Sequence, residues 1–255
     1  MMIARNLKVV RGGRPVVSDA CCRIRKGQLT AICGPNGAGK STLLMSLAGL
    51  VAPCEGEVSI EGQPIGQLTP RERARLIGFL PQQAEAAWDV DVRTLISLGR
   101  LPWRAVPGRP VRAKVDADRA AIASAISDMQ LEGLADRPVS RLSGGEKART
   151  MMGRVLAGDP RYILADEPFA SLDIGHASDL VRLMKMQASR GLGLAVVMHD
   201  LALAMNHADR VIVLDRGRIV ADAPPDDALS EEAIARVWKA RVRWLGEPGS
   251  RALAV

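Results

Sequence analysis

The sequence predicts an α/β fold: a mixed sheet with an antiparallel β-subdomain, and a helical subdomain inserted into it. Three observations predict this. Short apolar runs alternate with turn residues over the first thirty positions, apolar strands then alternate with helical segments, and the strand pattern disappears between about residues 84 and 141. With 255 residues, 47% of them hydrophobic, the chain can bury the core of a single domain, 1–255, that contains the insertion.

The antiparallel part is predicted from the amino-terminal runs Leu7–Val10 and Cys21–Ile24. Gly12-Gly13 and Lys26-Gly27 supply the turn residues beside them. Residues 56–62 are expected to add another edge strand.

The parallel part is predicted from strands that alternate with helices. Leu29–Cys33 leads through a glycine-rich turn into a helical pattern at Ser41–Leu50. Further strands are expected at Tyr162–Ala165, Leu194–Met198 and Val211–Leu214, and further helices near Gly175–Ser189 and at Leu201–His207. This alternation is typical of a parallel sheet wrapped by helices.

The inserted helical subdomain, approximately 84–141, is predicted from two helical patterns around a proline-rich loop. The helices are expected at Val92–Arg100 and Lys114–Met129, and the loop at Leu101–Pro110. After Pro224 we expect one helix, Glu231–Lys239, and then a tail to which the sequence assigns no structure.

Composition narrows the function classes. The net charge of +7 is spread along the chain, and seven aromatic residues leave few side chains to stack on bases, which favours a solvated basic surface over a nucleic-acid site. Four cysteines without metal-ligand spacing are expected to be small buried thiols in a reducing compartment. There is no stretch of eighteen apolar residues and no signal peptide, so we expect neither a membrane span nor export.

A phosphate-binding loop is predicted between the strand Leu29–Cys33 and the helix that follows. The residues Gly34, Pro35, Asn36, Gly37, Ala38, Gly39, Lys40 and Ser41 match the pattern G-x-x-x-x-G-K-[ST], and Thr42 is included as a further phosphate contact. Glycines allow backbone N–H groups to surround phosphate oxygens. Lys40 would place its charge on the β- and γ-phosphates, and Ser41 its hydroxyl on Mg²⁺. The core is therefore expected to be a phosphate-loop ATPase core.

Two carboxylates, Asp166 and Glu167, follow the apolar run that begins at Tyr162. A buried strand would carry them to the carboxyl edge of the sheet, where the phosphate loop also lies. Asp166 is expected to hold Mg²⁺, usually through water, and Glu167 to take a proton from the attacking water.

The sequence at Leu142–Glu146, Leu-Ser-Gly-Gly-Glu, resembles the signature of the ABC ATPase family. Ser143, Gly144 and Gly145 open a helix, where backbone N–H groups can bind an anion; in the family they face the γ-phosphate held by the other subunit. The resemblance therefore implies two composite ATP sites in a homodimer. Taken alone, the segment also reads as an ordinary Ser-capped helix start.

Further site residues follow from the resemblance. Gln82 is similar to the glutamine that touches Mg²⁺ and the attacking water, with Gln83 as an adjacent alternative. Asp173, in Ser171-Leu172-Asp173, resembles the segment that crosses the dimer interface, and His199 resembles the histidine that contacts the γ-phosphate. With Glu167 also present, the resemblance implies full turnover. His176 and His207 are expected to be structural.

Arg11 departs from the family, whose members often place a tyrosine there to stack on adenine. An arginine can stack on a base, although it is flexible and solvated. The other reading is that Arg11 points into solvent and a different side chain packs on the base.

Residues Val92–Arg100 and Ala208–Arg218 resemble importer ATPases for iron–siderophore, haem and cobalamin uptake. That resemblance implies two copies of this chain beneath two membrane permease subunits, on the cytoplasmic side of the membrane, with a substrate-binding protein as an indirect partner. The expected cofactors are ATP and Mg²⁺, and no nucleic acid is expected. The alternative is a non-transport ABC ATPase, associated with DNA or ribosomes or accessory to iron–sulfur assembly.

Overall fold

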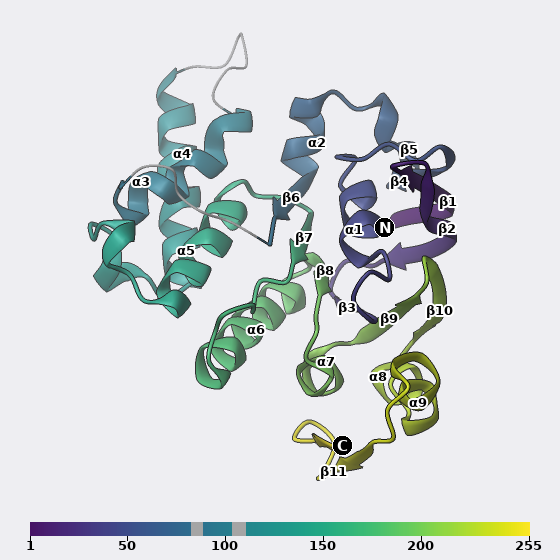
Figure 1. The fold of residues 1–255 in the computed structure, drawn as a ribbon. Coiled ribbons are helices and arrows are strands. Elements are labelled where there is room, and N and C mark those ends of the chain that lie inside the picture. The colour runs from purple at the N-terminus through teal and green to yellow at the C-terminus, as the bar shows by residue number, and fades with distance from the viewer. Residues whose placement is uncertain (83–88, 104–110) are drawn as a thin grey trace.

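The computed structural model describes residues 1–82, 89–103 and 111–255, and the side chains of all of these except 111–114. Two sheets lie beside each other, with the amino terminus at the smaller one and the carboxyl terminus beside a short hairpin at the far end (Figure 1). A helical group containing α3, α4 and α5 stands apart from the smaller sheet. Predicted positions 83–88 and 104–110, including Gln83, lie outside the described residues.

The smaller sheet is antiparallel, with strand order β2-β1-β4-β5. Its strands are β1 (Met2–Arg11), β2 (Arg14–Ile24), β4 (Glu55–Ile60) and β5 (Gln63–Pro64). The prediction that residues 56–62 form an edge strand was wrong in one respect. Glu61 and Gly62, both with positive φ, form a two-residue turn that folds the chain back, so β5 takes the edge and β4 becomes internal.

The larger sheet has the order β10-β9-β3-β8-β7-β6, and only β10 runs antiparallel to its neighbour. Its strands are β3 (Leu29–Cys33), β6 (Ile77–Leu80), β7 (Tyr162–Asp166), β8 (Gly193–Val197), β9 (Arg210–Asp215) and β10 (Arg218–Ala223). All residues of β3, β7 and β8 are buried, as expected for parallel strands covered on both faces. The predicted α/β class with a mixed sheet is confirmed.

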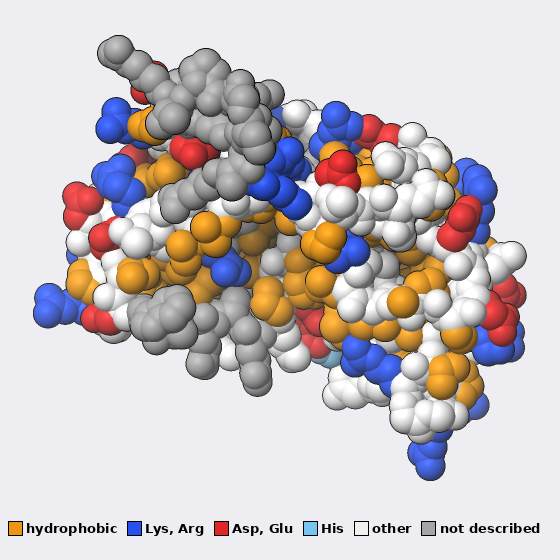
Figure 2. All heavy atoms as spheres, turned by 90° about the horizontal axis from the view of Figure 1, so that it is seen from above, with side chains coloured by type: hydrophobic (Ala, Val, Ile, Leu, Met, Phe, Trp, Pro, Cys, Tyr) orange, Lys and Arg blue, Asp and Glu red, His pale blue; other side chains and the backbone are white. Residues whose placement is uncertain are grey.

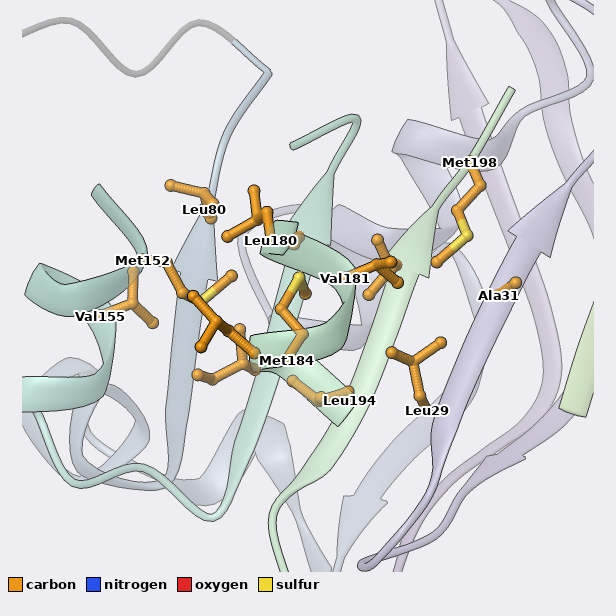
Figure 3. Close-up of a cluster of buried hydrophobic side chains, with 14 of the residues drawn as sticks. Leu29, Ala31, Leu80, Met152, Val155, Leu180, Val181, Met184, Leu194 and Met198 are labelled. Carbon is orange, nitrogen blue, oxygen red and sulfur yellow. The ribbon is translucent and has the colours of Figure 1, made fainter. Parts of the chain in front are cut away.

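Helices cover both faces of the larger sheet. They are α1 (Lys40–Leu47) on the face toward the antiparallel sheet, and α5 (Gly144–Ala157), α6 (Ile174–Ser189) and α7 (Leu201–His207) on the other. Figure 3 shows the second face, where Val181 and Met184 of α6 lie beside Leu194 of β8, and Leu29 and Ala31 of β3 belong to the same buried cluster. Alternate residues of β3, such as Ile32, pack with α1 instead.

The described part of residues 84–141 consists of helices joined by turns, with one isolated β-bridge, Asp91 to Pro138, and no strand. It contains α3 (Val92–Ser97), the 3₁₀ helix η2 (Leu98–Trp103), α4 (Val111–Asp128), η3 (Glu132–Leu134) and η4 (Val139–Arg141). Before it, η1 (Ile65–Gln67) and α2 (Pro70–Leu76) connect β5 to β6. None of the helices in the described ranges is long and apolar enough to cross a membrane.

The carboxyl-terminal segment is more ordered than the sequence indicates. After α8 (Pro225–Ala228) and α9 (Glu231–Trp238), two short strands, β11 (Arg243–Leu245) and β12 (Ala252–Ala254), pair antiparallel. Asn206 of α7 donates to the Arg251 carbonyl and accepts from the Arg251 N–H, both at 2.8 Å, and thereby anchors this hairpin to the core.

The expectation that all four cysteines are buried holds for Cys22 and Cys33 and was wrong for Cys21 and Cys54, which are exposed. Burial raises the pKa of the Cys22 and Cys33 thiols to about 12. Cys21 lies on the solvent side of the antiparallel sheet, where its Sγ donates to Asn6 Oδ1.

Basic and acidic side chains are interspersed over the face seen in Figure 2. That face carries no single large basic patch among its described residues, which agrees with the dispersed charge of the sequence.

Candidate functional site

The phosphate loop connects β3 to α1 at the carboxyl edge of the larger sheet. Its conformation requires glycine at two positions. A Cβ on Gly34 would lie 2.2 Å from the Leu214 carbonyl oxygen, and one on Gly39, where φ is 100°, would lie 2.6 Å from the Val16 carbonyl oxygen. The loop therefore runs in direct contact with the backbones of β9 and β2.

Lys40 is the first residue of α1 and is buried. Its Nζ donates to the carbonyl oxygens of Gly34 at 2.9 Å and Pro35 at 3.0 Å, and among the residues described it forms no ion pair. Burial lowers the pKa of the Lys40 ammonium, an effect that the Glu167 carboxylate opposes. A buried cation without a direct counter-ion at a helix amino terminus favours binding of an anion such as a polyphosphate.

Asp166 ends β7 and lies against the phosphate loop, where the Ser41 hydroxyl donates to its Oδ1 at 3.0 Å. Burial raises the pKa of the Asp166 carboxyl, while the Ser41 hydrogen bond lowers it. Hydroxyl and carboxylate oxygens are the ligands that Mg²⁺ prefers, so this pair fits the ion expected from the sequence.

Glu167 lies at the centre of a second contact set, and its φ of 51° is unusual for a residue other than glycine. Gln82, just after β6, donates from Nε2 to Glu167 Oε2 at 2.7 Å. The Nε2 of His199, just after β8, is hydrogen-bonded to Glu167 Oε1.

A cavity of about 520 Å³ lies beside these groups, and Gly34, Pro35 and Asp166 are not among the residues that line it. Its walls are Val16, Asn36, Gly37, Ala38, Gly39, Lys40, Ser41, Thr42, Gln82, Glu167 and His199. The structure thus brings together the phosphate loop and the carboxyl ends of β6, β7 and β8. Val16 lines the cavity but was not predicted from the sequence, because valine is not a residue type that indicates a binding site. Its position just after the first hairpin turn is the only feature of the sequence that could have indicated it.

Ser143, Gly144 and Gly145 lie elsewhere, at the start of α5, and do not line this cavity. The Ser143 hydroxyl accepts from the Glu146 N–H at 3.2 Å, and the Glu146 carboxylate accepts from the Ser143 N–H at 2.8 Å. This reciprocal pair is a capping box, so Ser143 caps α5 in the single chain.

Asp173 is also outside the cavity and caps α6. Its Oδ1 accepts the His176 backbone N–H at 2.8 Å, and its Oδ2 lies 2.7 Å from His176 Nδ1. These contacts lower the pKa of Asp173 below its ordinary value, and the hydrogen bond from the His176 backbone has the largest effect.

Arg11 ends β1, and its guanidinium contacts Met45 Sδ of α1 at 4.0 Å. It is exposed and does not line the phosphate-loop cavity, whereas Val16 does.

Comparison with known proteins agrees with this arrangement. Residues 17–170 match the family model described as "ABC transporter". The hemin import ATP-binding protein HmuV of Rhodococcus jostii (strain RHA1) is 42% identical over 99% of this chain and 84% of its own length. The petrobactin import ATP-binding protein YclP of Bacillus subtilis (strain 168) is 33% identical over 93% of this chain and 92% of its own length.

Among solved structures, the ATP-binding cassette MJ0796, a dimer in a post-hydrolysis state bound to ADP and Pi, superposes with a TM-score of 0.73. It is 26% identical, and the match covers 88% of this chain and 99% of that one.

Proposed function

The chain belongs to the ABC transporter family, and we propose that it is the subunit that powers import of an iron chelate, haem or siderophore, or of cobalamin. It binds and hydrolyses ATP, as ATP-binding members of this family do. The observation that carries the proposal is that Lys40, Ser41 and Glu167 line one cavity, with Asp166 hydrogen-bonded to Ser41, in a chain whose relatives are named as import proteins.

In the proposed reaction a water oxygen attacks the γ-phosphorus of ATP while Glu167 takes the water's proton. The bond between the γ-phosphorus and the β–γ bridging oxygen breaks, and ADP leaves with its electron pair. Lys40 stabilises charge on the β- and γ-phosphates, and His199 contacts the γ-phosphate. Gln82 and His199 are each hydrogen-bonded to one oxygen of Glu167 in the free chain. Because each carboxylate oxygen has a further lone pair, the attacking water can donate to Glu167 beside these contacts.

Mg²⁺, when bound, would neutralise negative charge on the phosphate oxygens. We propose that Ser41 and Asp166 hold it, with Gln82 as the third group. The Ser41–Asp166 contact of 3.0 Å supports this assignment because it places two oxygen ligands beside the phosphate loop.

We further propose that two copies of the chain form two composite sites, in which Ser143, Gly144 and Gly145 of one copy face the γ-phosphate bound by the other. Their position outside the cavity of their own chain supports this, as does the dimeric state of the MJ0796 cassette. In the proposed transporter this dimer lies on the cytoplasmic side of the membrane under two permease subunits, with a substrate-binding protein as an indirect partner. Residues 84–141 are its helical subdomain within the single domain 1–255.

The non-transport alternative is not favoured, since the relatives reported above are named as import proteins. Haem and siderophores are preferred to cobalamin as the proposed cargo, because the two relatives are named for hemin and petrobactin import. The chain's own residues do not select the cargo, because none of the proposed roles places a residue against it.

The test is uptake by a strain that lacks this gene, complemented with wild type, Lys40→Ala or Lys185→Ala. Lys185 is the matched control, because it is an exposed lysine of α6 that pairs with Asp209, away from the cavity. Wild type and Lys185→Ala should restore uptake of labelled haem or of a ferric siderophore, and Lys40→Ala should not. If wild type hydrolyses ATP but restores neither of these nor cobalamin, the proposed cargo is wrong.

A further inference from the structure

The imidazole of His176, the third residue of α6, lies between two segments that are far apart in the sequence. On one flank, Nδ1 is 2.7 Å from Asp173 Oδ2. On the other, a Cβ on Gly145 would lie 2.2 Å from His176 Cδ2 and 2.6 Å from Cγ. Because Nδ1 and Cδ2 are bonded to opposite sides of Cγ, the ring acts as a spacer between Asp173 and the first turn of α5.

The neighbouring glycine, Gly144, is packed less tightly than Gly145. The close contact at the start of α5 is therefore the one between Gly145 and His176. A Cβ on Gly144 would lie 3.8 Å from Leu172 Cδ2 and 3.9 Å from the Ser171 carbonyl oxygen, both ordinary van der Waals distances. Only Gly145 is packed so tightly that a side chain would force His176 to move. Packing against His176 in the same chain therefore explains why residue 145 is a glycine.

The same segment is connected to the proposed base. The Ala170 N–H donates to the Glu167 carbonyl and the Leu172 N–H to the Phe169 carbonyl, each at 3.1 Å. These two turns, with Ser171 at a φ of 69°, carry the chain from Glu167 to Asp173. The backbone thus runs from Glu167 to Asp173 through two hydrogen-bonded turns, and Asp173 and Gly145 both lie against His176.

We propose that His176 is a positioning residue that fixes Ser171–Asp173 against the amino end of α5, so that both segments meet the partner subunit as one unit. This rests on the proposed function, in which Ser143–Gly145 act across the dimer, and on the resemblance of Asp173 to the segment that crosses the dimer interface. Ile174, between Asp173 and His176, is 91% exposed, so this surface is open in the single chain. Loss of the imidazole then impairs dimer closure and turnover without changing the cavity that binds ATP, since His176 does not line it.

Three variants separate the two contacts. His176→Ala removes both. His176→Asn places an amide N–H near the position of Nδ1 and keeps the contact with Asp173, whereas His176→Phe keeps a ring against Gly145 and loses the donor. His207→Ala is the control, because His207 is a half-buried histidine at the end of α7 that, among the described residues, is neither hydrogen-bonded to Asp173 nor packed against Gly145.

The full-length protein is measured for kcat, ATP affinity, melting temperature and, in a Glu167→Gln background, ATP-dependent dimerisation. His176→Ala should lower kcat and dimer affinity by about tenfold or more, because Ser171–Asp173 would no longer be held in position for dimer closure. The ATP affinity of the monomer should be unchanged. His176→Asn and His176→Phe should lie between it and wild type, since each keeps one contact, and His207→Ala should match wild type.

Wild-type kcat and dimerisation in His176→Ala would overturn the proposal. So would a parallel fall in melting temperature, ATP affinity and kcat in all three variants, which would indicate a role in folding alone. The proposed function fails separately, if wild type does not hydrolyse ATP or if Glu167→Gln leaves hydrolysis intact.

Discussion

Gln82 and Glu167 lie 85 positions apart in the sequence, yet the Gln82 Nε2 donates to the Glu167 Oε2 at 2.7 Å. His199 Nε2 is hydrogen-bonded to the other carboxylate oxygen. In the free chain both oxygens of the proposed base are therefore hydrogen-bonded to protein groups, and each keeps a further lone pair that can accept from a water.

Glu167→Gln is expected to lower the steady-state rate of ATP hydrolysis by at least about a hundredfold, which is the lower end of the range that a general base contributes. ATP binding should be retained, because the amide keeps the shape of the side chain, and a shift to dimer with ATP should appear on gel filtration. Turnover at the wild-type rate would remove Glu167 from the role of base.

Gln82→Ala should lower kcat by about tenfold, within the range that misplaced catalytic groups cost, while the affinity for ATP measured without Mg²⁺ changes little. The reason is that Gln82 contacts Glu167 and makes no hydrogen bond to the phosphate loop among the described residues. The measurement is the separation of kcat from nucleotide affinity. A faster rate would show instead that Gln82 restrains the base.

Asp166→Asn should raise the melting temperature of the ligand-free protein at pH 7. The pKa of Asp166 is raised by burial in the folded chain, so the stability it contributes is present below the unfolded pKa and lost as pH rises through the folded pKa. At pH 7 the ionised form costs stability, and the amide removes this cost.

In a chain of this size each 1 kcal/mol of gained stability would raise the melting temperature by about 2–4 °C. The gain should shrink as pH falls toward the ordinary pKa of aspartate. The extra stabilisation that Mg²⁺ with ATP gives wild type should be absent from the variant, and thermal scans with and without both ligands measure the two effects. A variant that still gains this stabilisation would argue against Asp166 as a metal ligand.

Ser143→Arg should leave ATP binding to each monomer intact and block dimer closure, because a bulky cation would fill the anion site meant for the partner's γ-phosphate. Ser143 also caps α5, so Ser143→Ala is the control that loses the cap, worth about 1 kcal/mol, without adding bulk.

Mixing Ser143→Arg with Lys40→Ala subunits tests whether the sites are shared between subunits. In a mixed dimer one composite site receives both defects and the other neither, so partial hydrolysis should return. Its absence, once mixed dimers are shown to form, would contradict shared sites.

Arg11→Tyr should tighten ATP binding by up to about 1 kcal/mol if this position faces the adenine, the modest gain typical of aromatic stacking. In wild type, ATP and GTP should then be hydrolysed at similar rates, because a guanidinium stacks on either base. Paired titrations with both nucleotides measure this. A strong ATP preference that survives the substitution would place base recognition elsewhere, with Val16 as the nearest described candidate in the cavity wall.

Sequence alone determined the α/β class and the segments of the phosphate loop, because those features are local. From Leu29 to Leu47 a buried strand, a glycine-rich turn and a helix follow one another directly, and short-range backbone geometry is enough to place Lys40 at the helix start. Long apolar strands such as Tyr162–Asp166 were equally visible, since each is buried over its whole length.

The tertiary structure alone decided which distant groups meet. Strand order places β6, β7 and β8 side by side, and only this brings Gln82, Glu167 and His199 to one edge. The short strands β5, β6, β11 and β12 escaped the sequence analysis because pairing, rather than local propensity, makes them strands. The spacing of His176 between Asp173 and Gly145 depends on helix packing, which no pattern along the chain encodes.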